Sequence, residues 1–307
     1  MKSNEVISFV NQNGKKIEAH GGGLLFFEGM YYWYGEDRRE NCYVRAYRSK
    51  DLVHWEDCGA MITTRTPIVP FKKGIEKHQL LNEDGTKVNL ERPKVIYNEE
   101  TRQFVMWMHF ENGKDYLDAM AAIATSAYPD HGFTYRGAFR PLGHMSRDCT
   151  LFKEENGTAY FISASNENQD LHIYRLSSDY LSVDYFVQKL FVGLYREAPA
   201  LMKIEGTYYL LSSYCTGWLP NQCQYATATA IEGKWSELHN IGNHNTYHSQ
   251  PAFLFEVNGV PYYLGDCWGG VNWEKIEEFD YTKSSYLCMG FVFEDGKLFF
   301  DKDKENN

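Results

Sequence analysis

Short apolar runs, each about as long as a β-strand, alternate with Gly, Asn and Asp turns along the whole chain, and helical periodicity is nearly absent. Five stretches repeat one pattern. Each has a polar residue, then small residues or Pro, an apolar run, a turn that usually contains Gly, and a second run rich in Tyr and Phe. They span residues 20–36, 91–109, 148–165, 197–214 and 250–267. The pattern predicts five β-hairpins.

Further apolar runs, which often end on an aromatic turn, lie between these hairpins, so each repeat holds about four strands. Repeats of four antiparallel strands, about 50–70 residues long, indicate a β-propeller, in which each blade packs against its neighbours. We therefore predict an all-β, five-bladed β-propeller in a single domain over residues 1–307, with a core of about 5–303 and no appended carbohydrate-binding module. A two-sheet sandwich is the alternative, but it does not require the same polar residue to restart each hairpin.

The polar residues that open the hairpins are in register, at spacings of 71, 57, 49 and 53 residues. In a propeller the first strand of each blade lies next to the axis, so we expect these side chains to form a ring around a central cavity. The five residues are His20, Glu91, Asp148, Glu197 and Gln250. Three carboxyl groups in one cavity should have pKa values that are pushed apart.

Two interpretations of this ring stay open from spacing alone. Polar residues can line a wet channel and hydrogen-bond exposed backbone. Alternatively, two carboxyl groups on facing blades leave room for a substrate, as acid-catalysed glycoside cleavage requires. Seven Trp and 23 Tyr favour the second interpretation, because flat rings stack on sugars, although most of these residues must belong to the core.

Composition narrows the class of protein. With 43% hydrophobic residues the chain can bury a large core. The net charge of −10 is spread over short clusters rather than one basic face, so we expect no nucleic-acid partner. No run approaches the roughly 20 apolar residues of a membrane span, and the N-terminus has no signal-like apolar region. These features predict a soluble, cytoplasmic protein without a membrane partner.

Several motifs carry a resemblance to a known family: "AHGGGLLF", "LERPKVIYN", "FVMWMH", "SRDCTLF", "YREAPALM", "CTGWLPN" and "HSQPAF", in this order. Together they resemble glycoside hydrolase family 43 and, within it, the exo-β-1,3-galactanase subfamily, subfamily 24. The resemblance runs over nearly the whole chain. It implies a five-bladed propeller that removes galactose from the non-reducing end of β-1,3-galactan or β-1,3-galacto-oligosaccharides with inversion.

The resemblance also implies roles for the ring residues. Glu197 of "REAPA" matches the general acid, and Asp148 of "SRDCT" matches the carboxylate that orients this acid and raises its pKa. The Asp that serves as base in the broad family is missing, because His20 stands in its register. Gln250 matches a glutamine that positions or activates the water. Since an amide is a poor base, Glu91 is the alternative.

Other residues match positions around the terminal sugar in the subfamily, and for each of them plain packing or capping is the alternative. We expect these substrate-binding residues to be His20, Glu36, Arg92, Tyr116, Asn168, Thr216 and Trp218. No cofactor is expected. The resemblance allows a structural calcium ion on the propeller axis, which His20 or His248 would face, but no metal ligand is assigned.

Two other functions stay open. A β-xylosidase or α-L-arabinofuranosidase of the same broad family would use the Asp that is missing here. A non-catalytic galactan-binding propeller would explain why His20 and Gln250 are both weak bases, but it leaves the retention of Glu197 and Asp148 unexplained.

Overall fold

The computed structural model describes residues 6–71, 75–274, 279–294 and 296–304, which form five four-stranded antiparallel sheets. The first two are β1 (His20–Phe27), β2 (Met30–Glu36), β3 (Cys42–Ser49), β4 (Glu56–Thr63), and β5 (Asn89–Asn98), β6 (Gln103–Glu111), β7 (Met120–Ser126), β8 (Thr134–Phe139). The third is β9 (Cys149–Lys153), β10 (Ala159–Ser165), β11 (Asp170–Leu176), β12 (Val183–Leu190). The fourth and fifth are β13 (Arg196–Ile204), β14 (Thr207–Tyr214), β15 (Gln224–Ala228), β16 (His239–Asn240), and β17 (Gln250–Val257), β18 (Val260–Cys267), β19 (Ser285–Glu294), β20 (Lys297–Phe300).

Helical structure in the described residues is confined to short turns. Three are 3-10 turns, at Pro141–Gly143, Thr246–His248 and Tyr281–Lys283, and α1 (Asp301–Lys304) is one α-helical turn. None of these helices has the length or apolar character needed to cross a membrane.

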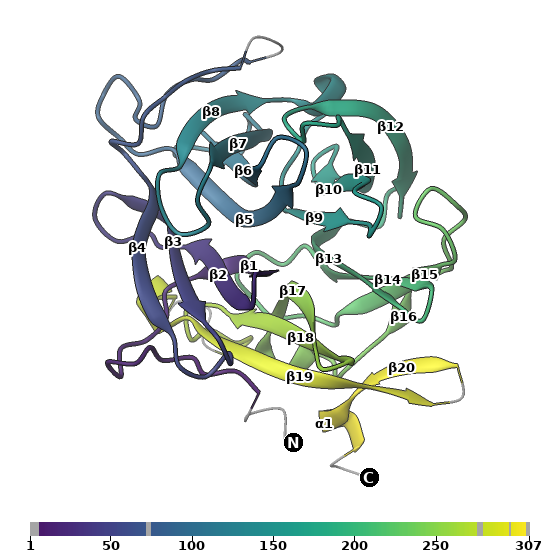
Figure 1. The fold of residues 1–307 in the computed structure, drawn as a ribbon. Coiled ribbons are helices and arrows are strands. Elements are labelled where there is room, and N and C mark those ends of the chain that lie inside the picture. Colours follow the sequence, from purple (N-terminus) through teal and green to yellow (C-terminus); the bar gives the residue numbers. More distant parts are fainter. Residues whose placement is uncertain (1–5, 72–74, 275–278, 295, 305–307) are drawn as a thin grey trace.

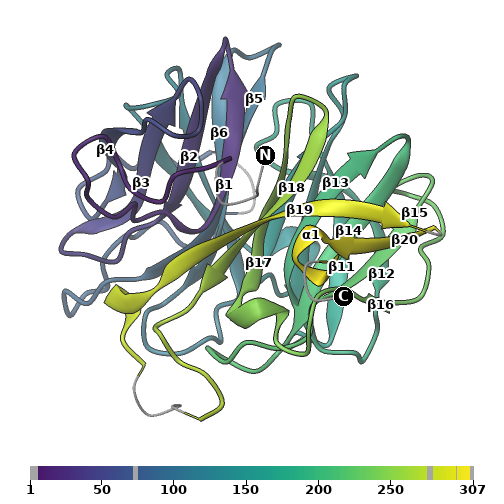
Figure 2. The same ribbon diagram turned by 90° about the horizontal axis from the view of Figure 1, so that it is seen from below.

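The five sheets are arranged as blades around one axis (Figure 1). Within each sheet the strands follow the order of the chain, and the innermost strands β1, β5, β9, β13 and β17 each contact the next one around the axis. The ring closes where β17 contacts β1, so the first and fifth blades lie side by side (Figure 2). The predicted all-β, five-bladed propeller is confirmed.

The hydrophobic core consists of five clusters, and each lies between two neighbouring blades. Blades one and two share the first cluster, and blades five and one share another, which contains Trp33, Trp55 and Tyr286. The N-terminal residues Val6 and Ile7 belong to this second cluster. Because every blade buries both faces, a single repeat has no independent core, and the repeats are stable only together.

A β-bulge near the start of the innermost strand recurs in four blades. The register shifts at His20/Gly23 in β1, Glu91/Lys94 in β5, Glu197/Ala200 in β13 and Pro251/Phe253 in β17. In three of these blades the residue after the ring residue has a left-handed backbone, with φ of 59° at Gly21, 54° at Arg92 and 51° at Ala198. A bulge re-aims side chains, so this distortion sets the direction of the ring residues relative to the strand.

The glycines of "HGGG" are required by close contact within the first blade. A Cβ on Gly22 would overlap the carbonyl oxygen of Tyr34 in β2, and a Cβ on Gly21 would meet Oε1 of Glu36. Gly23 leaves space for Lys94 and Phe253 from two other blades. The motif therefore brings β1 close to β2 and lets side chains cross the axis.

We expect Gly22→Ala to destabilise the protein by about 3 kcal/mol, because the added methyl group overlaps backbone that cannot move away without breaking the β1–β2 pairing. Urea unfolding monitored by circular dichroism measures the loss. Gly206→Asn, in the β13–β14 turn with φ of 80° and open space around it, is the control and should change stability by less than about 1 kcal/mol. Equal losses in the two variants would contradict this account.

Candidate active site

A cavity of about 330 Å³ lies on the axis at the end where the innermost strands begin. Residues from all five blades line it. They are Glu36, Arg38, Glu91, Arg92, His109, Tyr116, Arg147, Asp148, Asn168, Glu197, Cys215, Gly217, Trp218, Gln250 and Trp268. A larger hollow of about 820 Å³ is lined mainly by residues further along the same five strands, and a smaller share of its lining residues is titratable. The smaller cavity therefore concentrates the titratable groups.

Four of the five predicted ring residues line the cavity, and His20 does not. The His20 side chain is fully buried, with Nδ1 3.0 Å from Oδ1 of Asp266 and its ring stacked on Tyr286. This corrects the expectation that His20 contacts a ligand. Its ring points into the interface between the first and fifth blades, where Asp266 binds Nδ1, Tyr286 stacks on the ring and Oε2 of Glu18 lies 3.5 Å from Nε2.

Glu197 has a pKa far above that of an exposed glutamate. Its Oε1 accepts a hydrogen bond from Nε2 of Gln250 at 2.9 Å, and its Oε2 lies 3.4 Å from Nδ2 of Asn168. Burial, and then the negative charge of Asp148, raise the pKa of Glu197 to about 8. Glu197 therefore holds a proton at neutral pH and can donate it.

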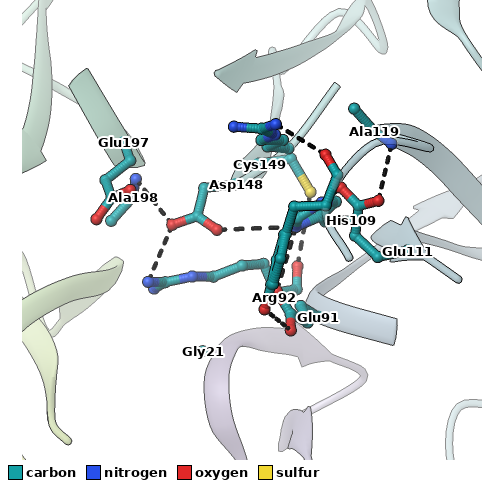
Figure 3. A network of polar contacts seen from close by, with 12 residues as sticks. Gly21, Glu91, Arg92, His109, Glu111, Ala119, Asp148, Cys149, Glu197 and Ala198 are labelled. Atoms are coloured by element: carbon teal, nitrogen blue, oxygen red, sulfur yellow. Dashed lines mark hydrogen bonds and ion pairs between the residues drawn. The ribbon is translucent and has the colours of Figure 1, made fainter. Parts of the chain in front are cut away.

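Asp148 stands directly beside this acid (Figure 3). Its Oδ2 accepts the backbone N–H of Ala198 at 3.1 Å and pairs with Nη2 of Arg92 at 3.1 Å. Both contacts bring an N–H donor to this oxygen, and the one from Arg92 carries a positive charge. A fixed negative charge next to Glu197 is the arrangement that keeps a neighbouring carboxyl group protonated.

Glu91 has the opposite environment. Its Oε1 accepts hydrogen bonds from Nη2 of Arg38 and from the Tyr116 hydroxyl, each at 2.9 Å, and its Oε2 lies 3.3 Å from Nδ1 of His109. Burial alone would raise the pKa of Glu91, but the hydrogen bond from His109 and the charge of Arg38 outweigh it and hold the pKa at about 2. Glu91 is therefore ionised and well suited to hold a water molecule or a hydroxyl group.

His109 was not predicted as a site residue, although it ends the quoted motif "FVMWMH". Its Nε2 lies 2.9 Å from Oε1 of the buried Glu111, and its Nδ1 faces Glu91 and Asp148. Burial lowers the pKa of His109, but the two glutamates raise it to about 9. A signal was present in the sequence, because His109 is the cross-strand partner of Glu91 in the β5–β6 hairpin.

The same cross-strand relation supplies other residues next to the ring. Glu36 pairs with His20, Ser213 pairs with Glu197, and Asp266 pairs with Gln250. The second strand of each of these hairpins therefore ends beside the site.

The structure places most, but not all, of the predicted substrate-binding residues at the cavity. Glu36, Arg92, Tyr116, Asn168 and Trp218 line the cavity, but Thr216 does not. The Thr216 hydroxyl donates to the Leu219 carbonyl and accepts from Asn221, so it holds a turn. This corrects the expectation that Thr216 binds substrate and supports the capping alternative.

Arg92 lines the cavity but has few free donors. Its backbone N–H donates to Glu36, Nη1 donates to the Pro251 carbonyl at 2.9 Å, and Nη2 contacts both Gln250 and Asp148. With 5% of its surface exposed, it connects other site residues to one another.

Sequence reasoning missed the residues that reach the cavity from loops and strand ends. Arg38 follows β2, lies over the Trp218 ring at 5.5 Å and pairs with Glu36 and Glu91. Trp268 follows β18 and donates from Nε1 to Gln250. Each stands two residues after the cross-strand partner of a ring residue, Arg38 after Glu36 and Trp268 after Asp266, so the repeat contained a position from which both could have been found.

The side chains do not fit the calcium ion that the resemblance allows. Within the described residues, Glu91, His109 and Asp148 bring three potential ligand atoms within 4.8 Å of one another. Calcium takes six to eight oxygen ligands, whereas one of these atoms is a nitrogen. Both carboxylates are already paired with guanidinium groups, Arg38 on Glu91 and Arg92 on Asp148.

The fold and the cavity agree with comparisons to known proteins. Residues 93–240 match the sequence model described as "Glycosyl hydrolases family 43". A family 43 β-1,3-galactosidase solved with galactodeoxynojirimycin is 30% identical, with a TM-score of 0.81, over 98% of this chain and 98% of that one. The chain belongs to glycoside hydrolase family 43.

Two other solved members of family 43 are similar to this chain. An exo-β-1,3-galactanase from Clostridium thermocellum is 42% identical, with a TM-score of 0.84, over 96% of this chain and 64% of that one. An exo-β-1,3-galactanase from Phanerochaete chrysosporium is 30% identical, with a TM-score of 0.81, over 98% of this chain and 66% of that one. The chain thus spans less than two thirds of the length of these two family 43 proteins.

A xylan 1,3-β-xylosidase from Vibrio is similar to a shorter part of the chain. It is 39% identical over 83 residues, which are 25% of this chain and 15% of that protein.

The raised pKa of Glu197 predicts a pH-dependent cost in stability. Between its ordinary pKa of 4.5 and the folded value of about 8, the folded protein keeps a proton that the unfolded chain releases. The free energy of unfolding therefore falls as the pH rises through this window. We expect Glu197→Gln, which has no such proton, to be more stable than the wild type at pH 8 by about 2 kcal/mol and to lose this advantage below pH 4.5.

Urea unfolding of both proteins between pH 4 and pH 8.5 measures this difference. The exposed Glu155→Gln is the matched control and should show the same difference from the wild type at every pH. A Glu197→Gln advantage that does not change with pH would contradict the assignment of the proton to Glu197.

Proposed function

We propose that this family 43 protein is an exo-acting, inverting glycosidase that releases terminal galactose from β-1,3-galactan or β-1,3-galacto-oligosaccharides. The observation that carries the proposal is the pairing of a protonated Glu197, beside Asp148, with an ionised Glu91 around one small cavity. Two carboxyl groups in opposite protonation states are what acid-catalysed glycoside cleavage needs.

The proposed mechanism uses side chains alone. Glu197 protonates the leaving glycosidic oxygen, and Asp148 keeps this acid protonated until the substrate is bound. Glu91 holds the attacking water on the opposite face of the sugar, and Gln250 holds Glu197 through its Nε2. An inverting enzyme needs about 6.5–9.5 Å between its acid and its water-activating group, which leaves room for the water. No cofactor enters this scheme.

Attack at a chain end is supported by the floor of the cavity. Nη1 of Arg92 reaches the Pro251 carbonyl of the fifth blade, and Nζ of Lys94 reaches the Gly21 carbonyl of the first. These two buried side chains close the cavity along the axis, so it is a blind pocket rather than a channel. A blind pocket suits the terminal unit of a sugar chain.

The choice of galactose is supported by the relatives. The similar proteins from Clostridium and Phanerochaete are exo-β-1,3-galactanases, and the second was solved with galactose and, as variants, with β-1,3-galactotriose. We carry this substrate class over to the present chain. Glu36, Arg38, Tyr116, Asn168 and Trp218 are then the side chains that surround the terminal sugar.

Product analysis of β-1,3-galactobiose by proton NMR tests the function. We expect α-galactose to appear first, as inversion of the β-linkage requires, and Glu197→Gln to lose a factor of about 10³ in kcat/KM. Glu205→Gln, in the distant β13–β14 turn, should keep wild-type activity. Binding without turnover would support the galactan-binding alternative, and turnover of β-xylosides or α-L-arabinofuranosides alone would support the other glycosidases.

A second expectation concerns pH. Glu197 must be protonated to act, so its pKa of about 8 sets the alkaline limit of activity. Asp148→Asn removes the negative charge that helps raise this pKa, so the alkaline limb of kcat/KM should move to lower pH by about one unit. Rate measurements from pH 5 to pH 9.5 check this. A limb that stays in place, or moves upward, would show that Asp148 does not raise the pKa of Glu197.

A further inference from the structure

Gln250 has its amide hydrogen-bonded on every side. Its Oε1 accepts from Nη2 of Arg92 at 2.5 Å and from Nε1 of Trp268 at 2.7 Å. Its Nε2 donates to Oε1 of Glu197 and to Oγ of Ser213, each at 2.9 Å. An amide oxygen accepts two hydrogen bonds and an amide nitrogen donates two, so this amide has no unused capacity.

The chemistry of these partners fixes the orientation of the amide. The guanidinium of Arg92 and the indole N–H of Trp268 are donors only, so the amide oxygen must face them. The nitrogen must then face Glu197 and Ser213. A flipped amide would direct its N–H groups at two other donors and its oxygen at a carboxyl oxygen.

This orientation has a consequence for the two oxygens of Glu197. The oxygen that receives the Gln250 N–H is Oε1, and the unprotonated oxygen of a carboxylic acid is the better acceptor. The acidic proton is then left to Oε2, which lies 3.4 Å from Nδ2 of Asn168, and the Cys215 thiol also contacts this carboxyl group.

We propose that Trp268 and Ser213 are positioning residues that hold the Gln250 amide with its nitrogen toward Glu197 and thereby keep the acidic proton on Oε2. This inference rests on the proposed function of Glu197 as the acid. It adds two residues that do not act on the sugar themselves.

Trp268 suits such a role because its surroundings fix the indole. Only 6% of its surface is exposed, and its ring packs against the Arg92 guanidinium at 5.5 Å and Trp218 at 5.3 Å. Its one hydrogen bond goes to Gln250. Ser213 is equally buried and lies across from Glu197 in the β13–β14 hairpin. Little of either side chain is available for a sugar.

A double-mutant cycle tests the proposal. Trp268→Phe keeps an aromatic ring and removes the donor, and should lower kcat on β-1,3-galactobiose about tenfold while KM changes less than twofold. In a Gln250→Ala background the same substitution should cost less than twofold, because the group through which it acts is gone. Trp273→Phe, which removes a hydrogen bond to the Pro220 carbonyl outside the cavity, is the matched control and should have no effect in either background.

Equal losses from Trp268→Phe in both backgrounds would overturn the proposal, as would a rise in KM without a fall in kcat, which would indicate direct packing on the sugar. If Trp268→Phe does not fold, Ser213→Ala provides the same cycle. It should lower kcat several-fold in the wild type and less than twofold in Gln250→Ala.

A second measurement needs no turnover. In ¹H–¹⁵N spectra the indole N–H of Trp268, assigned by its loss in Trp268→Phe, should exchange slowly with solvent and should exchange at least tenfold faster in Gln250→Ala. Unchanged exchange would overturn the proposal even if the enzyme is active. If Gln250→Ala accelerates the exchange but the wild-type protein leaves β-1,3-galactobiose intact, the contact is supported and the proposed function is rejected.

Discussion

The arrangement of the site depends on the guanidinium of Arg92, a buried positive charge at the axis. It joins Asp148 of the third blade to Gln250 and Pro251 of the fifth, and its backbone N–H binds Glu36 of the first. Burying a charge is costly unless it is paired and hydrogen-bonded, so these contacts have to form together. Once they form, four blades are held in one relative position around the cavity, because Arg92 itself belongs to the second.

Positive groups are distributed unequally among the carboxyl groups of the site. Arg92 and the Ala198 N–H bind Asp148, and Arg38, Tyr116 and His109 keep Glu91 ionised. Glu197 has the Gln250 amide, a distant asparagine and the Cys215 thiol as neighbours, and it faces the charge of Asp148. Burial and this charge therefore keep the proton on Glu197.

Some site residues were predicted from the sequence repeat and others were missed. The hairpin repeat placed Glu91, Asp148, Glu197 and Gln250 at one mouth of the axis, because all innermost strands start there. The repeat failed for His20, whose imidazole lies in the interface between the first and fifth blades against Asp266 and Tyr286. Arg38 and Trp268 were also missed, because they stand two residues beyond the cross-strand partners of His20 and Gln250 and only the hairpin starts were aligned.

By itself, the sequence determined the number of blades, the order of their strands and the positions from which the carboxyl groups enter the cavity, because these follow from a repeated pattern of apolar and polar residues. The tertiary structure alone decided which carboxyl group holds a proton and how the Gln250 amide is oriented. Both depend on partners such as Arg92, His109, Ser213 and Trp268. Arg92 and Ser213 belong to other blades than the Gln250 amide that they bind, and only the closed ring of blades brings them within hydrogen-bonding distance of it.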